Sequence, residues 1–426
     1  MRVHGNSSEA EQRARITLYG ARCLADNRSI RLASIAIANG RIERIYTGAG
    51  AAQPLQAEIG EIDLSGYCVL PGLVNAHDHL EFALYPRLAD GPYRNYIEWG
   101  EDIHRKFPNV IGRQHSIPKR VRLLWGGLRN LLCGVTTVAH HNPFWSEFTE
   151  QDFPVRVVKE FGWAHSIAQG GDLRAAFERT PIGHPFIVHA CEGVDELAQN
   201  ELWELDRLGL LGPSTVLVHG LAINRAGIRH LRERGCSLVV CPSSNYVLFG
   251  LLPDLELLSS IQRIALGSDS PLTASGNFLD EIVFAINQCG VSREDAYRMV
   301  TTGPAEILRL ADGEGSLIES GVADLIAVRD TIGNPIEHLE AISIDEIELV
   351  MIGGQVQLAS EAMQKRLPDW MIRSLEPLLL GNLLRWVNAP VAEILESAES
   401  VLGAGQIRIG DRIACTSASV EVQHAG

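Results

Sequence analysis

The sequence predicts an α/β protein made of one central block and two flanking β segments. Between 71 and 314, short apolar runs alternate with longer segments of helical periodicity, which is typical of a parallel sheet surrounded by helices. On both sides of this block the pattern changes to short alternating runs broken by turn residues. A chain of 426 residues, 46% of them hydrophobic, can bury the large core that such a fold requires.

The first flank, residues 1–70, is expected to supply the N-terminal part of a composite β domain. Apolar and polar residues alternate along 34–38 and again along 41–45, and Asn39-Gly40 lies between the two runs. Asn-Gly suits a type I′ turn, in which both central residues have positive φ. This segment therefore predicts a β-hairpin.

The central block, residues 71–314, contains seven candidate strands. They are apolar runs that end near His77, His140, Ile167, His189, His219, Cys241 and Ser268. Between 168 and 186 there is room for one short helix, 172–179, and not for a further strand and helix. We therefore expect a distorted TIM-type (β/α) barrel whose fourth strand is irregular or missing.

The second flank, residues 315–360, returns to short strands joined by Gly353-Gly354. We expect it to form the C-terminal part of the composite domain, a small β-sandwich built from both flanks of the barrel. Residues 361–426 are expected to be a helical C-terminal extension that packs on the body. Apolar residues on one face of a helix support this prediction: Val391, Ile394, Leu395, Ala398, Val401 and Leu402.

Composition excludes several classes of function. Acidic residues outnumber basic ones by 52 to 37, for a net charge of −15, and no block of Lys or Arg offers the positive surface that nucleic acids or anionic membranes need. No apolar run reaches the roughly 18 residues of a membrane span, and the N-terminus has no signal-peptide core. We expect a cytoplasmic protein without nucleic-acid or membrane partners.

Six polar side chains that can bind a metal or move a proton stand where predicted strands end: His77, His79, His189, Glu192, His219 and Asp269. His77 and His79 are two residues apart on an extended segment, so both imidazoles lie on one face. Any one of the six alone is more often a core histidine or a helix cap. Because the carboxyl ends of parallel barrel strands open on one face, we expect the six to converge there. Imidazoles with a carboxylate suit zinc or iron.

The sequence resembles the amidohydrolase superfamily, in particular its cytosine-deaminase-like and triazine hydrolase branch of metal-dependent aminohydrolases. The resemblance runs from 16 to 356. It rests on the motifs 69–79 (VLPGLVNAHDH), 134–137 (GVTT), 189–192 (HACE), 218–220 (VHG), 241–245 (CPSSN), 267–269 (GSD), 302–305 (TGPA) and 321–325 (GVADL).

The resemblance implies a site for one divalent metal ion, zinc first and iron as the alternative, with the ligands His77, His79, His189 and Asp269. It also implies three catalytic roles. Glu192 would shuttle protons, His219 would polarise water or the developing oxyanion, and Asp269 would accept a proton from water while it binds the metal.

The activity implied is hydrolytic deamination of an amino-substituted N-heterocycle or an amidine, by attack of hydroxide bound to the metal. The same attack would serve hydrolysis of a cyclic amide, a cyclic imide or a halogenated heterocycle, which is the alternative. A non-catalytic assembly protein of the same fold is less favoured, because all six polar positions are filled.

The lysines favour a single metal ion. Superfamily members with two metals commonly bridge them through a carboxylated lysine on the fourth strand. This chain has only Lys106, Lys119, Lys159 and Lys365, and none ends a predicted strand. Lys159 lies in 155–161, which has the pattern of a helix. The resemblance also implies a small-molecule substrate and a homodimer or larger homo-oligomer.

Candidate substrate contacts come from three regions. Trp99 belongs to an aromatic-rich segment after the first strand, where a lid or wall over a planar ring is expected. His140 and His141 end the second strand, and because adjacent side chains point to opposite faces, at most one is expected in the site. His165 on the third strand and Asn245 in a later turn complete the set.

Overall fold

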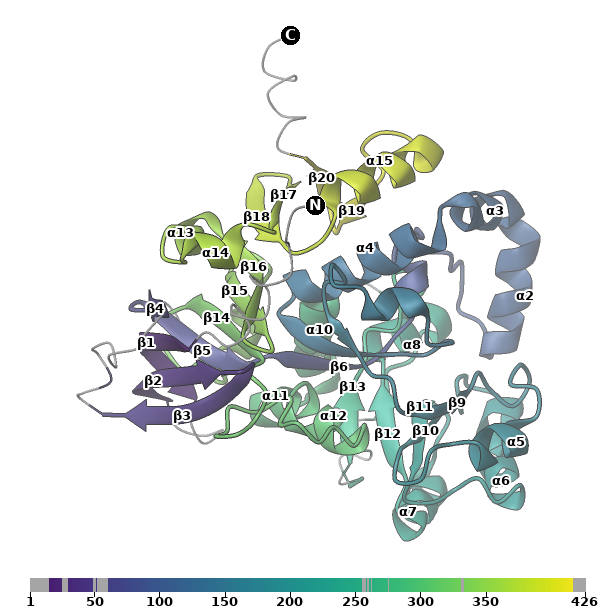
Figure 1. Ribbon diagram of the computed structural model, residues 1–426. Helices are drawn as coiled ribbons and strands as arrows, with labels where there is room; N and C mark the ends of the chain where they lie inside the picture. Colours follow the sequence, from purple (N-terminus) through teal and green to yellow (C-terminus); the bar gives the residue numbers. More distant parts are fainter. Residues whose placement is uncertain are drawn as a thin grey trace.

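The computed structural model describes residues 15–24, 30–48, 51, 60–254, 258, 260–261, 263–274, 276–330 and 333–416. An α/β body stands beside a large β-sheet, and helix α15 (Val391–Leu402) lies over the body (Figure 1). Within the described ranges, no helix has the length and apolar character needed to cross a membrane.

Eight short parallel strands form the centre of the body: β6 (Leu73–Asp78), β7 (Val135–His140), β8 (Arg156–Val157), β9 (Gly162–Ala164), β10 (Phe186–Ala190), β11 (Thr215–His219), β12 (Ser237–Val240) and β13 (Ile264–Leu266). They form two sheets, β6-β7-β8 and β13-β12-β11-β10-β9. An isolated bridge between Asp78 and Asp269 joins the sheets at one seam. At the other seam, no ladder pairs β8 with β9 in the described part of the chain. This is the distorted (β/α) barrel that the sequence predicts.

The structure contains a third barrel strand where the sequence indicates a helix. The sequence indicates seven strands and a helix over 155–161, but Arg156 and Val157 form β8, paired in parallel with Thr137 and Val138. The strand predicted to end near Ile167 is β9, which has only three residues and is the fourth strand because β8 precedes it; no strand lies in 165–185, all of which are described. A run as short as 155–158 fits either periodicity, and its buried β-branched valines favour extended backbone. The irregularity therefore extends over the third and fourth strands.

Helices and 3-10 turns follow the barrel strands. They are α2 (Tyr96–Lys106), α3 (Pro108–Ser116), α4 (Lys119–Leu132), α5 (Leu173–Glu178), α6 (Glu196–Arg207), α7 (Arg225–Arg234), α8 (Pro242–Phe249), α10 (Phe278–Cys289), α11 (Arg293–Met299) and α12 (Thr302–Ile307), with the 3-10 turns η2 (Leu80–Phe82), η3 (Ser146–Thr149) and η4 (Leu339–Ala341). Helix α2 lines a cavity at the strand ends, and one 3-10 turn, η4, lies in the second flank. The side chains of Asn95, Asp195 and Asn277 accept hydrogen bonds from first-turn N–H groups and so define where three of the helices begin.

Both flanks of the barrel contribute to one 12-stranded sheet. The first flank supplies β1 (Ile16–Leu24), β2 (Ile30–Ala38), β3 (Arg41–Thr47), β4 (Gly60–Asp63) and β5 (Tyr67–Pro71), and the second supplies β14 (Leu325–Arg329), β15 (Ile347–Ile352) and β16 (Gln355–Ser360). Antiparallel pairing of β5 with β14 joins the two flanks. Asn39 and Gly40 have φ of 52° and 74°, as the predicted type I′ hairpin requires. The composite β domain is confirmed.

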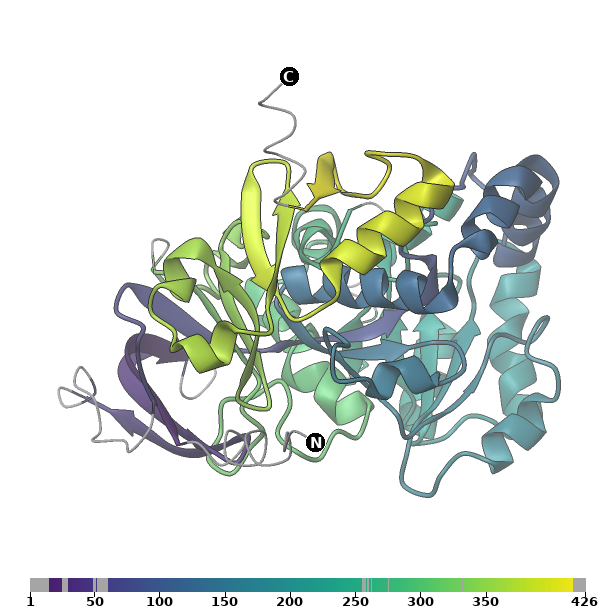
Figure 2. The ribbon, with the colours of Figure 1, turned by 45° about the horizontal axis from the view of Figure 1, so that its top comes forward.

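The extension after 360 is not only helical, which corrects a second expectation from the sequence. Besides α13 (Glu361–Gln364), α14 (Asp369–Ile372) and α15, it contains β17 (Glu376–Leu380), β18 (Leu383–Val387), β19 (Arg408–Ile409) and β20 (Arg412–Cys415). The β17–β18 hairpin turns at Gly381, whose φ is 62°, and β18 pairs with β16, so the sheet continues into the extension. As expected, α15 packs on the body, against α3 and α4 (Figure 2).

Helix α4 packs closely on the segment after β6 at Gly126, and a substitution there tests this contact. A Cβ added at Gly126 would lie 2.3 Å from the carbonyl oxygen of Leu80, a backbone atom. We expect Gly126→Ala to lower the free energy of unfolding by about 1–3 kcal/mol in urea titrations, because the added methyl group overpacks the core at this contact. Gly112→Ala in α3 is the matched control, since nothing lies within 4 Å of its added Cβ. The control should gain up to about 1 kcal/mol from helix propensity. Equal stability of the two variants would contradict this packing.

Candidate metal centre

The six polar side chains expected at one face of the barrel do converge there. His77 lies in β6 and His79 directly after it, while His189 and His219 lie in β10 and β11 and Asp269 follows β13. Ligand atoms of two overlapping groups, His77-His189-His219 and His77-His79-Asp269, lie within 4.8 Å of one another. All of these residues are buried. Glu192 stands at the edge of the cluster, with its Oε2 3.6 Å from Nε2 of His219.

The spacing of the ligand atoms fits a single divalent ion. Nε2 of His77 lies 3.2 Å from Nε2 of His189, and Oδ1 of Asp269 lies 3.6 Å from Nε2 of both His77 and His79. Bonds of about 2.0–2.2 Å to zinc at tetrahedral angles place neighbouring ligand atoms about 3.3–3.6 Å apart. Three imidazoles and a carboxylate are also donors that zinc accepts.

Neighbouring groups orient two of these ligands. The Nδ1–H of His189 donates to the carbonyl oxygen of His165 at 2.7 Å, which leaves the Nε2 lone pair directed at the centre. Oδ2 of Asp269 accepts hydrogen bonds from the hydroxyls of Ser244 at 2.6 Å and Thr273 at 2.7 Å. With Oδ2 held in this way, Oδ1 faces the imidazoles.

The backbone is strained at or just after the ends of three barrel strands. Cys191, His219 and Asp269 have φ of 57°, 75° and 57°, a left-handed conformation that residues other than glycine rarely adopt. Such residues cluster at functional sites, where the surrounding structure holds them in place. Here the turn after the strand directs Glu192, His219 and Asp269 toward the same centre.

Burial sets the protonation states of the imidazoles. It lowers the pKa of His79 and His189 well below the usual histidine range, and the neighbouring imidazoles lower it further. Burial lowers the pKa of His219 to about 4. All three are therefore neutral near pH 7, as metal ligands and proton acceptors must be.

The two carboxyl groups of the site are perturbed in opposite directions. Burial raises the pKa of Glu192 well above the usual glutamate range, and the charges of Asp269 and Glu201 raise it further. Burial also tends to raise the pKa of Asp269. The contacts of Asp269 with His77 and the other imidazoles outweigh this effect and lower its pKa overall. Burial thus favours the protonated form of Glu192, whereas the imidazoles favour the ionised form of Asp269.

A cavity of about 540 Å³ opens over this cluster. Its polar wall contains His79, His189, Glu192, His219, Asp269, Ser270 and Thr273. Phe82, Trp99 and Leu272 provide a flat apolar wall. This volume is within the range of small-molecule sites, and it would accept a planar heterocycle with a substituent.

The candidate substrate contacts divide into two groups. Trp99 and His165 line the cavity, whereas His140, His141 and Asn245 are buried behind its wall. Nδ1 of His140 accepts a hydrogen bond from the N–H of Leu80, so this ring faces away from the cluster. His141 stacks on His189 with ring centroids 4.1 Å apart.

Asn245 stands behind His219 and contacts its ring. Oδ1 of Asn245 lies 3.1 Å from Nδ1 of His219 and is the acceptor that places the imidazole proton on Nδ1. Nε2 of His219 then bears the lone pair, on the side of Glu192. Asn245 is therefore placed to orient His219 instead of touching a molecule in the cavity.

Glu201 belongs to the site and was missed from the sequence; its partner Tyr96 lies in the aromatic-rich segment that was expected to form a wall of the site. Glu201 accepts hydrogen bonds from the Tyr96 hydroxyl at 2.9 Å and from the N–H of Cys191 at 2.7 Å, and so supports the residue before Glu192. Burial raises the pKa of Glu201 to about 7. A signal was present, because Glu201 lies on the apolar face of α6 between Ala198 and Leu205.

No lysine lines the cavity, and all four lysines are within the described residues. Lys159 is exposed and follows β8. The cluster therefore offers donors for one ion and no lysine that could bridge two.

Comparisons with known proteins identify the family. The model of the amidohydrolase family matches residues 164–356. A 5-methylthioadenosine/S-adenosylhomocysteine deaminase of Natronomonas pharaonis is 30% identical over 412 residues, covering 79% of this chain and 89% of that protein. An 8-oxoguanine deaminase of Pseudomonas aeruginosa is 26% identical, covering 78% of this chain and 90% of that protein.

A solved structure shows the same fold. The adenosine deaminase of Xanthomonas campestris, determined with bound zinc, superimposes with a TM-score of 0.67 over 91% of this chain and 97% of that one, at 18% identity. Together with the relative that is 30% identical along most of both chains, this likeness leads to one conclusion: the chain belongs to the amidohydrolase family and is a metal-dependent hydrolase of carbon–nitrogen bonds other than peptide bonds.

Proposed function

We propose that this enzyme hydrolytically deaminates an amino-substituted N-heterocycle or a related amidine. The relatives described above are named as deaminases of purine compounds. The observation that carries the proposal is Glu192, a carboxyl group buried at the wall of a cavity of about 540 Å³, whose pKa burial raises. A protonated carboxyl can donate its proton to a ring nitrogen, and after it takes up a proton that the nucleophile has released it can donate again, to a departing amine.

One divalent ion, zinc first and iron as the alternative, would be held by the ligands His77, His79, His189 and Asp269. The distances of 3.2–3.6 Å between their donor atoms support this set. When bound, such an ion lowers the pKa of water towards about 7 and so supplies the nucleophile at neutral pH. The remaining chemistry is proton transfer, which falls to side chains of this chain.

His219 and Asp269 are the groups that would take a proton from the nucleophile. Nε2 of His219 carries a lone pair because Asn245 accepts from Nδ1, and the carboxylate of Asp269 is ionised. Once it has taken this proton, His219 would also stabilise negative charge on the attacking oxygen. Glu192, whose Oε2 is 3.6 Å from Nε2 of His219, would deliver protons to the nitrogen side of the same carbon.

The cavity wall supports a planar substrate. Phe82 and Trp99 offer aromatic surface, and Nε1 of Trp99 donates to the carbonyl oxygen of Leu88, which fixes its ring. His165 and Gln169 offer polar groups at the rim. We assign substrate binding to Trp99 and His165, and a positioning role to Asn245 and His141.

Assays of ammonia release test the reaction directly. The enzyme, loaded with zinc, should release ammonia from at least one member of a panel of aminopurines, aminopyrimidines, pterins and aminotriazines, and lose this activity after chelation. Adding zinc back should restore it. Release of an acid or a halide without ammonia would replace deamination by hydrolysis of a cyclic amide, imide or halogenated ring.

Two substitutions separate metal binding from proton transfer. Asp269→Ala removes a ligand, so both zinc content by elemental analysis and turnover should be lost. Glu192→Gln keeps shape and burial, so zinc should stay bound while kcat falls by about 10²–10⁴-fold. Glu196→Gln, on the exposed side of the next helix, is the control and should retain both. Normal turnover by Glu192→Gln would refute the role of this carboxyl.

The hydroxyls behind Asp269 should tune zinc affinity. Thr273→Val preserves the side-chain shape but removes the hydrogen bond to Oδ2 of Asp269. We expect zinc affinity to fall by about 10–100-fold in competition with a chelator, since outer partners of metal ligands have effects of this size. Thr17→Val, at a buried threonine of the β domain, is the matched control. Unchanged affinity in Thr273→Val would show that Asp269 does not need this support.

A further inference from the structure

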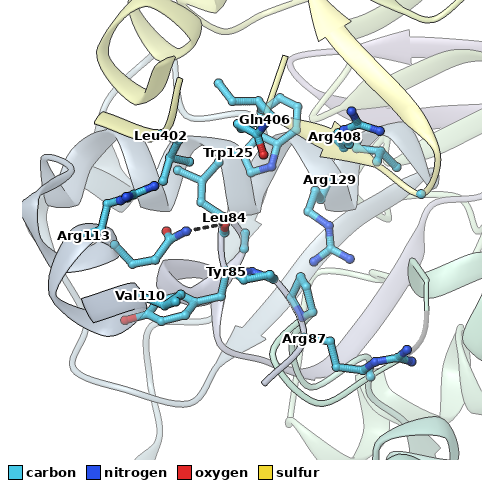
Figure 3. A pocket seen from close by; sticks show the side chains of 18 of the residues that line it. Leu84, Tyr85, Arg87, Val110, Arg113, Trp125, Arg129, Leu402, Gln406 and Arg408 are labelled. Carbon is cyan, nitrogen blue, oxygen red and sulfur yellow. Dashed lines mark hydrogen bonds between the residues drawn. The ribbon is translucent and has the colours of Figure 1, made fainter. Parts of the chain in front are cut away.

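A second cavity, of about 690 Å³, lies behind the first and has no part in the proposed reaction. Its walls come from 83–87, from α3 and α4, from the segment after Asp269 and from 402–410 of the C-terminal extension (Figure 3). Because segments far apart in the sequence enclose it, the cavity exists only in the folded protein. Its volume is within the range of sites that bind small molecules.

Positive charge gathers in this cavity although the chain as a whole has a net charge of −15. Four arginines line it, Arg87, Arg113, Arg129 and Arg408, and no acidic residue is among its described lining residues. In Figure 3, Arg113 lies at the left of the cavity, and Arg408, Arg129 and Arg87 lie at the right, from top to bottom. In the described structure, no carboxylate oxygen lies within 4.0 Å of the guanidinium of Arg113, Arg129 or Arg408.

Arg129 shows that this charge is built into the fold. Its side chain is only 8% exposed, and one of its nitrogens donates to the carbonyl oxygen of Gly276 at 2.8 Å. A guanidinium has five N–H donors, so further donors remain for an acceptor in the cavity. Burial disfavours the charged guanidinium of Arg129, and the charges of Asp78 and Asp280 offset this only in part, so an anion in the cavity would stabilise the cation further.

Two more polar atoms at the cavity have no protein partner. Nε1 of Trp125 is a buried donor without an acceptor, on a side chain that is 1% exposed. Oε1 of Gln114 is a buried acceptor without a donor, while its Nε2 donates to the carbonyl oxygen of Leu84 at 2.8 Å. Buried polar groups are nearly always paired, so the Trp125 N–H points to an absent acceptor, whereas the Gln114 oxygen needs a donor such as a water molecule.

Apolar surface completes the site. Tyr85, Val110 and Leu402 line the cavity beside the indole of Trp125. We propose that this cavity binds a small organic anion with phosphate or carboxylate oxygens and a flat apolar part. The guanidinium groups and the Trp125 N–H take the anionic oxygens, since arginine pairs with either group in a bidentate way, and the aromatic and aliphatic side chains cover the apolar part.

The two cavities share their dividing wall. Ser270, Leu272 and Thr273 line the first cavity, whereas Pro271 and Ala274 line the second. The Thr273 hydroxyl donates to Oδ2 of Asp269, so an anion that contacts Pro271 and Ala274 sits directly behind a support of the metal centre. The binding site itself does not depend on the proposed deamination.

Calorimetric titration of the full-length, zinc-loaded enzyme tests the site. The probes are naphthyl phosphate, naphthoate and the neutral naphthyl alcohol, at low ionic strength. We expect saturable binding of at least one anion with a stoichiometry of one and none of the alcohol below about 10 mM. Tighter binding of naphthyl phosphate assigns a phosphate ligand, and tighter binding of naphthoate a carboxylate ligand.

Variants locate the binding. Arg113→Gln and Arg408→Gln change exposed side chains, so the fold should be retained, and each should weaken anion binding by about 10-fold or more. Trp125→Phe keeps an aromatic ring and removes the unpartnered N–H, and it should weaken binding as well. Arg207→Gln, an exposed arginine of α6, is the control and should bind like the parent. Absence of saturable anion binding, or equal binding by all variants, would overturn the proposal.

Discussion

The seam between β6 and β13 is the constraint on which the rest of the structure depends. No regular ladder joins these strands. Instead, the N–H of His79 donates to the carbonyl oxygen of Asp269, and the N–H of Asp269 donates to that of His77. The three residues that close the barrel on this side are therefore three of the proposed metal ligands, and closing the barrel brings their side chains together. Gly267 makes the approach possible, because a Cβ there would lie 2.6 Å from Cβ of His77.

The same burial has opposite results at the two carboxyl groups of the site. Asp269 has two hydroxyl donors and a ring of imidazoles, so its negative charge is compensated within the protein. Glu192 has no such compensation and faces the charges of Asp269 and Glu201, so it retains its proton. Two carboxyl groups kept in different states by their surroundings are what acid–base chemistry at one carbon atom needs.

The sequence predicts the site better than the strands that carry it. Six polar residues at strand ends could be placed on one face because all strands of a parallel barrel end on the same side. The two-residue strand β8 could not be identified, since its register depends on β7 and not on its own periodicity. Strands β17 and β18 were missed for a related reason. β18 pairs with β16, and β17 pairs with β18 and β20, but the short alternation of both strands resembles the helical segments beside them.

The direction of individual side chains was also beyond the sequence. His140 and Asn245 are neighbours of site residues in the sequence but lie behind the cavity wall. His140 accepts a hydrogen bond from the N–H of Leu80, and Asn245 lies on α8 and contacts His219 from behind. Alternation predicts at most one of His140 and His141 in the site; neither lines the cavity, and His141 is the one that stacks on His189. Which of the two it is depends on the register of β7 against β6, a tertiary property.

The C-terminal extension links the β domain to the barrel. An exposed strand edge at β16 would offer unpaired backbone groups, and the hairpin β17–β18 covers it. From this hairpin the chain continues into α15, which packs on α3 and α4, and then returns through β19 and β20 to pair with β17. Residues 402–410 are thereby fixed at both ends over α4, the helix that carries Trp125 and Arg129. The arginine-lined cavity is thus a product of the extension, because without this wall Trp125 and Arg129 would face solvent and their polar groups would be hydrated.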